Sequence, residues 1–156
     1  MSSYLVRRGL HALIGLCAVA LLVPVGCSQG LKRVPAGGSV ELDGKPMEGG
    51  ILSFDPDVSR GNTAQVSCTS PIRGGRFELQ TAGITRSDSG SGIPLGWYKV
   101  SVRANMVGAP PVFPGQPAFK IDPKYLNPNR TPLTIEIVEH PQPGAYDLKL
   151  TATGKK

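Results

Sequence analysis

Seven short segments of this sequence alternate between apolar and polar residues. A segment of this kind, folded as an extended strand, has one apolar face and one polar face. No segment after residue 30 keeps the 3.6-residue apolar period of an amphipathic helix beyond about one turn. The pattern predicts an all-β fold, a seven-stranded antiparallel β-sandwich with Greek-key connections. The apolar positions are Val40 and Leu42; Leu52 and Phe54; Ala64, Val66 and Cys68; Phe77 and Leu79; Tyr98, Val100, Val102 and Ala104; Leu133, Ile135 and Ile137; and Tyr146, Leu148 and Leu150.

The sequence DGKP follows the first of these runs and predicts a tight turn. Asp43-Gly44 favours a two-residue turn of type I′, because that turn needs positive φ at both central residues. Pro46 has no N–H group to donate, so we expect strand pairing to lapse there and to resume near Ile51. Asp43, Lys45 and Glu48 are then solvated turn charges, and a catalytic cluster is not expected here.

The first 26 residues differ from the rest of the chain. Arg7 and Arg8 precede an uncharged, mainly apolar run that ends at Cys27. A basic start followed by an apolar stretch and small residues is typical of a secretory signal. The alternative is a transmembrane anchor, which needs about 20 apolar residues. Because this run is shorter and is interrupted by His11 and Pro24, we expect residues 1–26 to be a signal segment.

The end of that segment, LLVPVGC, resembles the lipobox of bacterial lipoproteins. In that motif a small residue precedes the cysteine that receives the lipid, and Gly26 and Cys27 fit these positions. Pro24 stands where the motif usually has leucine, which is a departure. The other candidate, Cys17, follows a bulky leucine. The resemblance implies that lipid on Cys27 is the link to a membrane, and Ser28 resembles the pattern that permits transfer to an outer membrane, not retention at the inner one.

The rest of the chain predicts one domain with flexible ends. We expect a flexible tether at residues 27–37, the β-sandwich at 38–152 and a short tail at 153–156. Loss of Arg7 and Arg8 with the signal lowers the net charge from +6 to +4. The basic residues form no block and have no interleaved aromatic residues, so nucleic acid is not expected as a partner. Cys68 would be left as a lone, buried and unreactive thiol.

A proline-rich stretch, residues 105–132, interrupts the strand pattern. It holds seven of the 15 prolines, and long irregular segments in compact domains are often functional. We expect residues 105–131 to form an excursion on the surface of the sandwich. Phe113, Phe119 and Tyr125 lie in it, and Trp97 is out of phase with the apolar face of its run. These four aromatic residues are the candidate contacts for a ligand or partner, such as an envelope protein or a carbohydrate.

Four segments together resemble a known family. They are GGSVELDGKPMEGGILSFDP, GGRFELQT, PLGWYKVSV and IDPKYLNPNRTPLTIEI, and they occur in this order between residues 37 and 137. The chain resembles the small carboxypeptidase regulatory-like lipoproteins of the planctomycete type. The resemblance implies a transthyretin-like (prealbumin-like) or Ig-like β-sandwich, exported, anchored by lipid and accessory or structural in role. Ser70 and Arg73 stand where this family often has acidic residues, which argues against a cation site at that turn.

The sequence offers little chemistry for an enzyme. After residue 26 the one histidine is His140, between Glu139 and Pro141, and no G-x-S-x-G motif supplies a nucleophile. One His and one Cys do not reach the ligand number of a zinc site. The transthyretin-like hydrolases of purine breakdown close with a Y-R-G-S tail, which this chain lacks. We therefore expect a non-catalytic protein with no cofactor and no bound metal. Its expected role is structural or in protein interaction at the cell envelope, with ligand binding, for example of carbohydrate, as the alternative.

Overall fold

A computed structural model describes residues 32–81 and 89–154 of the chain. Expectations for the signal segment, for Cys27 and for residues 82–88 and 155–156 lie outside these ranges. In the described part, the larger sheet has six strands and the smaller one three, with a further strand against its middle. The larger sheet has the order β13 (Thr134–Ile137), β10 (Gly96–Arg103), β4 (Ile51–Pro56), β5 (Cys68–Pro71), β7 (Gln80–Thr81) and β8 (Gly90–Ser91). The smaller sheet has the order β14 (Leu148–Leu150), β2 (Gly37–Leu42) and β3 (Lys45–Pro46), and β6 (Arg76–Glu78) also pairs with β2.

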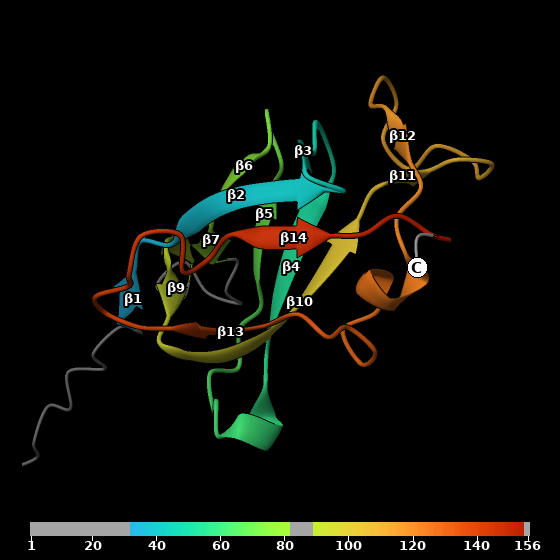
Figure 1. Ribbon diagram of the computed structural model, residues 1–156. Helices are drawn as coiled ribbons and strands as arrows, with labels where there is room; N and C mark the ends of the chain where they lie inside the picture. Colours follow the sequence, from blue (N-terminus) through green and yellow to red (C-terminus); the bar gives the residue numbers. More distant parts are fainter. Residues whose placement is uncertain (1–31, 82–88, 155–156) are drawn as a thin grey trace, which may run out of the picture.

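The two sheets form the layers of a sandwich, as the alternation predicts. In Figure 1, β2 and β14 run nearly horizontally in front of β4 and β5, which run nearly vertically. Two short ribbons complete the fold, β1 (Arg33–Val34) with β9 (Ile93–Pro94) and β11 (Asn105–Met106) with β12 (Ala118–Phe119). The described residues include no α-helix, and their two 3-10 helices are η1 (Val58–Arg60) and η2 (Pro123–Leu126). The predicted all-β sandwich is confirmed.

The core lies between the layers and is built from the predicted apolar phases. Phe54 is at its centre, with ring centroids 5.8 Å from Phe77 and 6.4 Å from Tyr98. Tyr98 is fully buried, and its hydroxyl donates a hydrogen bond to the carbonyl oxygen of Pro94. A buried phenol without a partner would cost stability, so this bond lets β10 place a polar atom in the core.

The turn at Asp43-Gly44 has the predicted geometry. Both residues have positive φ, 52° and 79°, and Leu42 pairs with Lys45 across a two-residue loop. Pairing ends after Pro46, and β4 begins at Ile51 as expected. The chain changes layers in between, because β4 pairs with β5 and β10 in the other sheet. The segment connects one sheet to the other.

Cys68 lies on the buried face of β5, which supports a prediction about its reactivity. Its sulfur is fully buried and lies 3.3 Å from the Thr81 hydroxyl, and burial raises the pKa of the thiol. Since the thiolate is the reactive form, native protein is expected to react with a thiol reagent much more slowly than unfolded protein. The measurement is the labelling rate of residues 28–156, in which Cys68 is the one cysteine. Equal rates in the two states would show that the strand phase is wrong.

The strand expected around residues 64–68 is shorter than predicted. It begins at Cys68, and Ala64 and Val66 are only half-buried. The Asn62 side chain explains the difference, because its oxygen accepts a bond from the Ala64 amide and its nitrogen donates to the Trp97 carbonyl. These bonds satisfy the backbone outside a ladder.

Pairing between β2 and β14 corrects a second expectation. The sandwich was expected to be antiparallel, but these two strands are parallel, with Val40 opposite Leu148 and Leu42 opposite Leu150. The 138–147 connection returns the chain from β13 in one sheet to β14 in the other, so β14 runs in the direction of β2. Alternation specifies the face of a residue but not the direction of its strand.

The tether expected at residues 27–37 is also shorter. Arg33 and Val34 form β1, which pairs with β9, and β2 already begins at Gly37. Val34 and Ala36 are buried in the core. Val34 and Ala36 alternate as in a strand, but the proline and glycines beside them are typical of a flexible segment, so no strand was predicted here.

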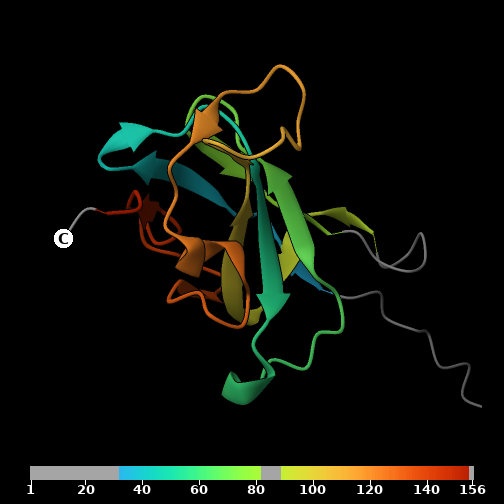
Figure 2. The same ribbon diagram turned by 90° about the vertical axis from the view of Figure 1, so that its right-hand side faces the viewer.

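The proline-rich stretch divides into two parts. Residues 105–120 project at one end of the sandwich, as β11 and β12 show in Figure 1. Figure 2 places this projection at the end opposite η1. Residues 121–131 do not project, because Ile121 and Tyr125 are buried in the core and η2 packs against β10. The expectation of a surface excursion therefore holds for 105–120 and is wrong for 121–131.

Candidate functional site

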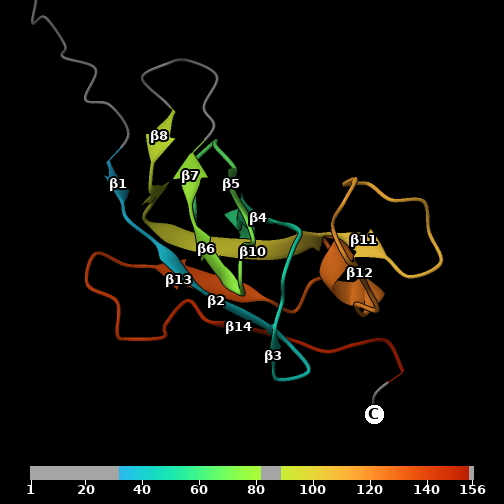
Figure 3. The same cartoon turned by 90° about the horizontal axis from the view of Figure 1, so that it is seen from above.

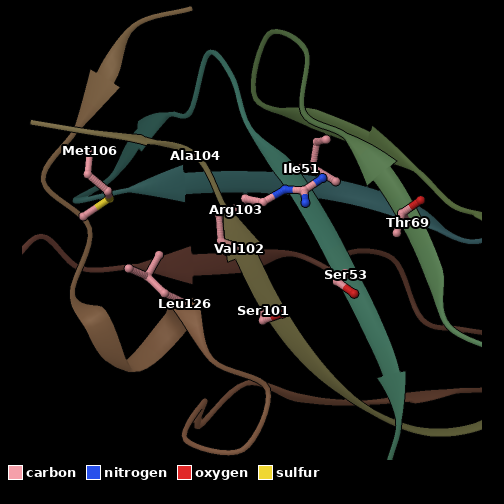
Figure 4. Close-up of a pocket in the computed structure, with 9 residues that line it drawn as sticks. All are labelled: Ile51, Ser53, Thr69, Ser101, Val102, Arg103, Ala104, Met106 and Leu126. Atoms are coloured by element: carbon pink, nitrogen blue, oxygen red, sulfur yellow. The ribbon is translucent and has the colours of Figure 1, made fainter. Parts of the chain in front are cut away.

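The outer face of the larger sheet carries a trough of about 350 Å³ at the end nearer to β11. Figure 4 shows its lining residues around β4 and β10, with Leu126 and Met106 on one side and Thr69 on the other. β4, β5 and β10 supply most of the lining, and β11 and η2 supply the rest. The residues are Ile51, Ser53, Thr69, Ser101, Val102, Arg103, Ala104, Met106 and Leu126.

Short polar side chains form the floor of this trough, and strand register aligns them. Ser101 is opposite Ser53, and Ser53 is opposite Thr69. The same row continues over Gln80 to Ser91 at the sheet edge. Because strands lie about 4.8 Å apart, a row across five strands is roughly 20 Å long. Its hydroxyl and amide groups can donate and accept hydrogen bonds, so the row suits an extended polar chain.

Arg103 makes one part of the trough basic, and its guanidinium group lies over an aromatic ring. The guanidinium carbon of Arg103 lies 5.5 Å from the centroid of the Phe113 ring, within cation–π range. Phe113 comes from the projecting 105–120 segment, so the position of that segment sets the position of the cation. On the side of the trough away from Thr69, Leu126 of η2 is 37% exposed and supplies an apolar surface (Figure 4).

Asn105 fixes the projecting 105–120 segment, which carries Phe113. Its side chain is buried and makes four hydrogen bonds with backbone groups of the loop. The amide nitrogen donates to the carbonyl oxygens of Phe113 and Gln116, at 2.7 and 3.0 Å. The side-chain oxygen accepts from the amides of Val112 and Phe113, both at 2.8 Å. One side chain thus bonds backbone groups of the loop between β11 and β12, where no strand ladder pairs them.

Asn105→Ala is therefore expected to loosen the loop without unfolding the sandwich. Four hydrogen bonds are lost, although the Phe113 carbonyl oxygen keeps the Gln116 amide as a donor, and each lost hydrogen bond costs about 0.5–1.5 kcal/mol. Hydrogen exchange at the Val112 and Phe113 amides is expected to become much faster, while exchange in β4 and β10 is unchanged. Asn129→Ala is the matched control, since the Asn129 side chain is exposed. Unchanged exchange at residues 112 and 113 would contradict this role of Asn105.

A second cluster surrounds Trp97 at the opposite end of β10. The guanidinium carbon of Arg60 lies 4.3 Å from the centroid of the Trp97 ring. The Trp97 carbonyl oxygen accepts hydrogen bonds from the Asp57 amide at 2.9 Å and from the Asn62 side chain at 2.7 Å. These bonds fix η1 against the start of β10. A hollow of about 360 Å³ lies here, lined by Trp97, Leu95 and Lys32 among others.

Asp57 is the buried charge of this cluster. Its carboxylate accepts hydrogen bonds from the Ser59 hydroxyl and amide and lies 3.8 Å from both Lys99 Nζ and Arg60 Nε. The Ser59 hydroxyl chiefly holds the pKa of Asp57 below its ordinary value, against desolvation and with help from Lys99 and Arg60. One anion thus faces two cations, and the arrangement orients Arg60 over the ring.

The four aromatic residues expected to contact a ligand do not form one site. Trp97 is half-buried under Arg60, and Phe113 is half-buried beside Arg103, at opposite ends of the sheet. Phe119 packs against the core. Tyr125 is only 5% exposed, and its hydroxyl lies 3.2 Å from that of Thr151. The expectation for Tyr125 is wrong, because η2 turns its ring inward.

The structure also shows where His140 and the candidate metal ligands lie. His140 is exposed in the turn after β13. Within residues 32–81 and 89–154, no three His, Cys, Asp or Glu side chains are grouped so that they could hold a metal ion. No helix in these ranges is long and apolar enough to cross a membrane.

Sequence reasoning missed the trough and the residue that organises it. Ser53, Thr69 and Ser101 occupy polar phases of predicted strands or of their extensions, but their alignment depends on register across three strands. Asn105 directly follows the run that ends at Ala104, and nothing nearby marks its side chain as buried. An asparagine at the start of a proline-rich loop was the one available signal.

Comparison of the chain with protein-family models, with curated proteins and with solved structures finds no match.

Proposed function

We propose that this protein is an exported lipoprotein, held at the cell envelope by lipid on Cys27, whose non-catalytic β-sandwich acts by contact with other proteins. The observation that carries the proposal is positional. The uncharged apolar run ends at Gly26-Cys27, and the described fold begins only five residues later, at Lys32, with β1 at Arg33. A lipid at Cys27 would therefore connect almost directly to the folded domain.

The family resemblance and Ser28 refine the location. The four motifs that resemble carboxypeptidase regulatory-like lipoproteins all fall within the sandwich, and that family is anchored by lipid. Ser28 follows the proposed lipidated residue, a pattern that favours the outer membrane. The domain is then an accessory or structural module of the outer envelope, with the membrane as its first partner.

The trough supports an interaction role for the domain. Its floor is a row of hydroxyl and amide groups, and Arg103 and Leu126 also line it. Mixed polar and apolar linings of this kind are usual in contacts between proteins. The trough lies at the β11 end of the domain, whereas β1 lies at the other end (Figures 1 and 3). A tether at β1 leaves it open to a partner.

The alternative of a carbohydrate-binding module has less support. Sugar sites generally stack the ligand on an exposed aromatic ring. Among the four candidates, Trp97 and Phe113 have a guanidinium over the ring, Phe119 packs on the core and Tyr125 is buried. No observation in the described residues favours this function over protein contact.

The interaction role is tested by photo-crosslinking in intact cells. A photoreactive amino acid at Thr69, exposed on the trough floor, is expected to give a larger covalent adduct on illumination. The matched control is the same amino acid at Lys149, which is exposed on β14 in the other sheet. No adduct from position 69, or equal adducts from both positions, would contradict the trough as the contact surface.

A further inference from the structure

The hollow beside Trp97 lies where the chain enters the fold. Lys32, the first described residue, lines it together with Trp97, Leu95 and Arg60. Lys32 is held there by an ion pair of 2.9 Å with Glu139, in the turn after β13. The exit point of the N-terminal segment and the single tryptophan of the chain therefore share one surface.

Chain length limits how far this surface can lie from Cys27. Five peptide units separate Cys27 from Lys32, and a fully extended chain spans at most about 3.6 Å per residue, or roughly 18 Å. If Cys27 carries lipid, its backbone lies at the headgroup layer. The hollow is then within about two Debye lengths of the lipid surface at physiological salt. The tether also makes any docking of this end intramolecular, which raises its effective concentration.

The residues around the hollow have the chemistry of a membrane interface. Leu95 and Val138 flank the last strand pair, Gly96 with Ile137, and are 39% and 37% exposed. Trp97 is an amphipathic ring of the kind that accumulates at headgroup depth. Arg60 lies over this ring, and the charges nearby balance, because the cations Lys32, Arg60 and Lys99 are matched by the carboxylates of Asp57, Glu136 and Glu139. This combination of apolar, aromatic and balanced charged groups matches the interfacial layer of a phospholipid membrane.

We propose that this end of the domain, defined by Leu95, Trp97, Val138 and Arg60, docks on the phospholipid surface to which Cys27 is anchored. The inference rests on the proposed function, because it needs the lipid at Cys27. It fixes the orientation of the domain. Since the projecting 105–120 segment and β1 lie at opposite ends, the trough lies at the end of the domain away from the anchor (Figures 1 and 3).

Trp97 provides the test, because it is the only tryptophan in the chain. The full acylated protein is reconstituted in vesicles of phosphatidylcholine and phosphatidylglycerol that carry a brominated or spin-labelled lipid quencher. Quenching of Trp97 fluorescence by the lipid quencher is expected. Val138→Glu is expected to lower the ratio of docked to undocked protein about fivefold, the factor that corresponds to one charge at a lipid surface.

Val107→Glu is the matched control, because Val107 is an exposed valine in the projecting segment at the other end. It is expected to leave the quenching unchanged. Acylated, vesicle-bound protein without lipid quenching of Trp97 would overturn this inference and leave the anchor intact. Protection of Trp97 from aqueous acrylamide without lipid quenching would show that a second copy covers the surface, and would overturn it also. Absence of acyl groups on Cys27 would overturn the proposed function, and this inference with it.

Discussion

Phe54→Ala is expected to lower the free energy of unfolding by about 3–5 kcal/mol, the usual cost of replacing a buried phenylalanine by alanine. Phe54 is fully buried on β4 and contacts the rings of Phe77 and Tyr98, which come from β6 and β10. Its removal leaves a cavity where the two sheets meet. Since domains of this size are stable by about 5–15 kcal/mol, the loss is a large fraction of the total. Urea unfolding of residues 28–156 measures it.

Val58→Ala is the control for this core substitution. Val58 is 76% exposed in η1, and surface changes of this kind usually stay within about 0.5 kcal/mol. If the Phe54 variant unfolded at the wild-type urea concentration, the two layers would not share the core described here. If both variants lost stability equally, η1 would be more tightly packed than its exposure indicates.

Cys27→Ala is expected to abolish the membrane association of the protein. Each buried methylene of an acyl chain contributes about 0.8 kcal/mol, and two or more chains hold a protein firmly where a single one does not. Wild-type protein grown with labelled fatty acid is expected to carry the label and to sediment with membranes. The variant is expected to carry no label and to be soluble or left as the uncleaved precursor.

The other two cysteines are matched controls for that experiment. Cys17→Ala and Cys68→Ala keep Cys27 and are expected to be labelled as strongly as the wild type. Cys17 lies within the predicted signal segment, and Cys68 is buried in β5. Loss of label in the Cys17 variant alone would show that Cys17, and not Cys27, carries the lipid. Label in the Cys27 variant would contradict acylation at that residue.

The sequence predicted the core of this fold well because burial follows strand period. Tyr98, Val100, Val102 and Ala104 alternate along β10, and all four are buried. The Asp43-Gly44 turn was predictable for a local reason, since positive φ at both positions restricts the residues that fit. Both features depend on residues close together in the chain.

Features that depend on distant residues could not be predicted in the same way. The parallel pairing of β2 and β14 joins residues about 108 positions apart. The trough floor needs the register of β10, β4 and β5, which no local pattern contains. Tyr125 was placed on the surface because prolines surround it, but η2 packs against β10 and buries its ring. For the candidate site, the sequence therefore indicated which kinds of residue are present, but it did not predict which of them lie together in space.

β10 connects the two candidate surfaces of the domain. Trp97 lies near its start and Arg103 at its end, about 20 Å apart at the rise of an extended strand. A domain tethered near the first and open at the second could contact a membrane and a partner protein together.

The most direct test of this account is the mass of the N-terminal peptide of mature protein purified from the membrane fraction. The account predicts a peptide that begins at Cys27 and carries acyl groups, with thioether-linked diacylglyceryl on its sulfur. An unmodified N-terminal peptide that begins at another residue, recovered from soluble protein, would contradict it.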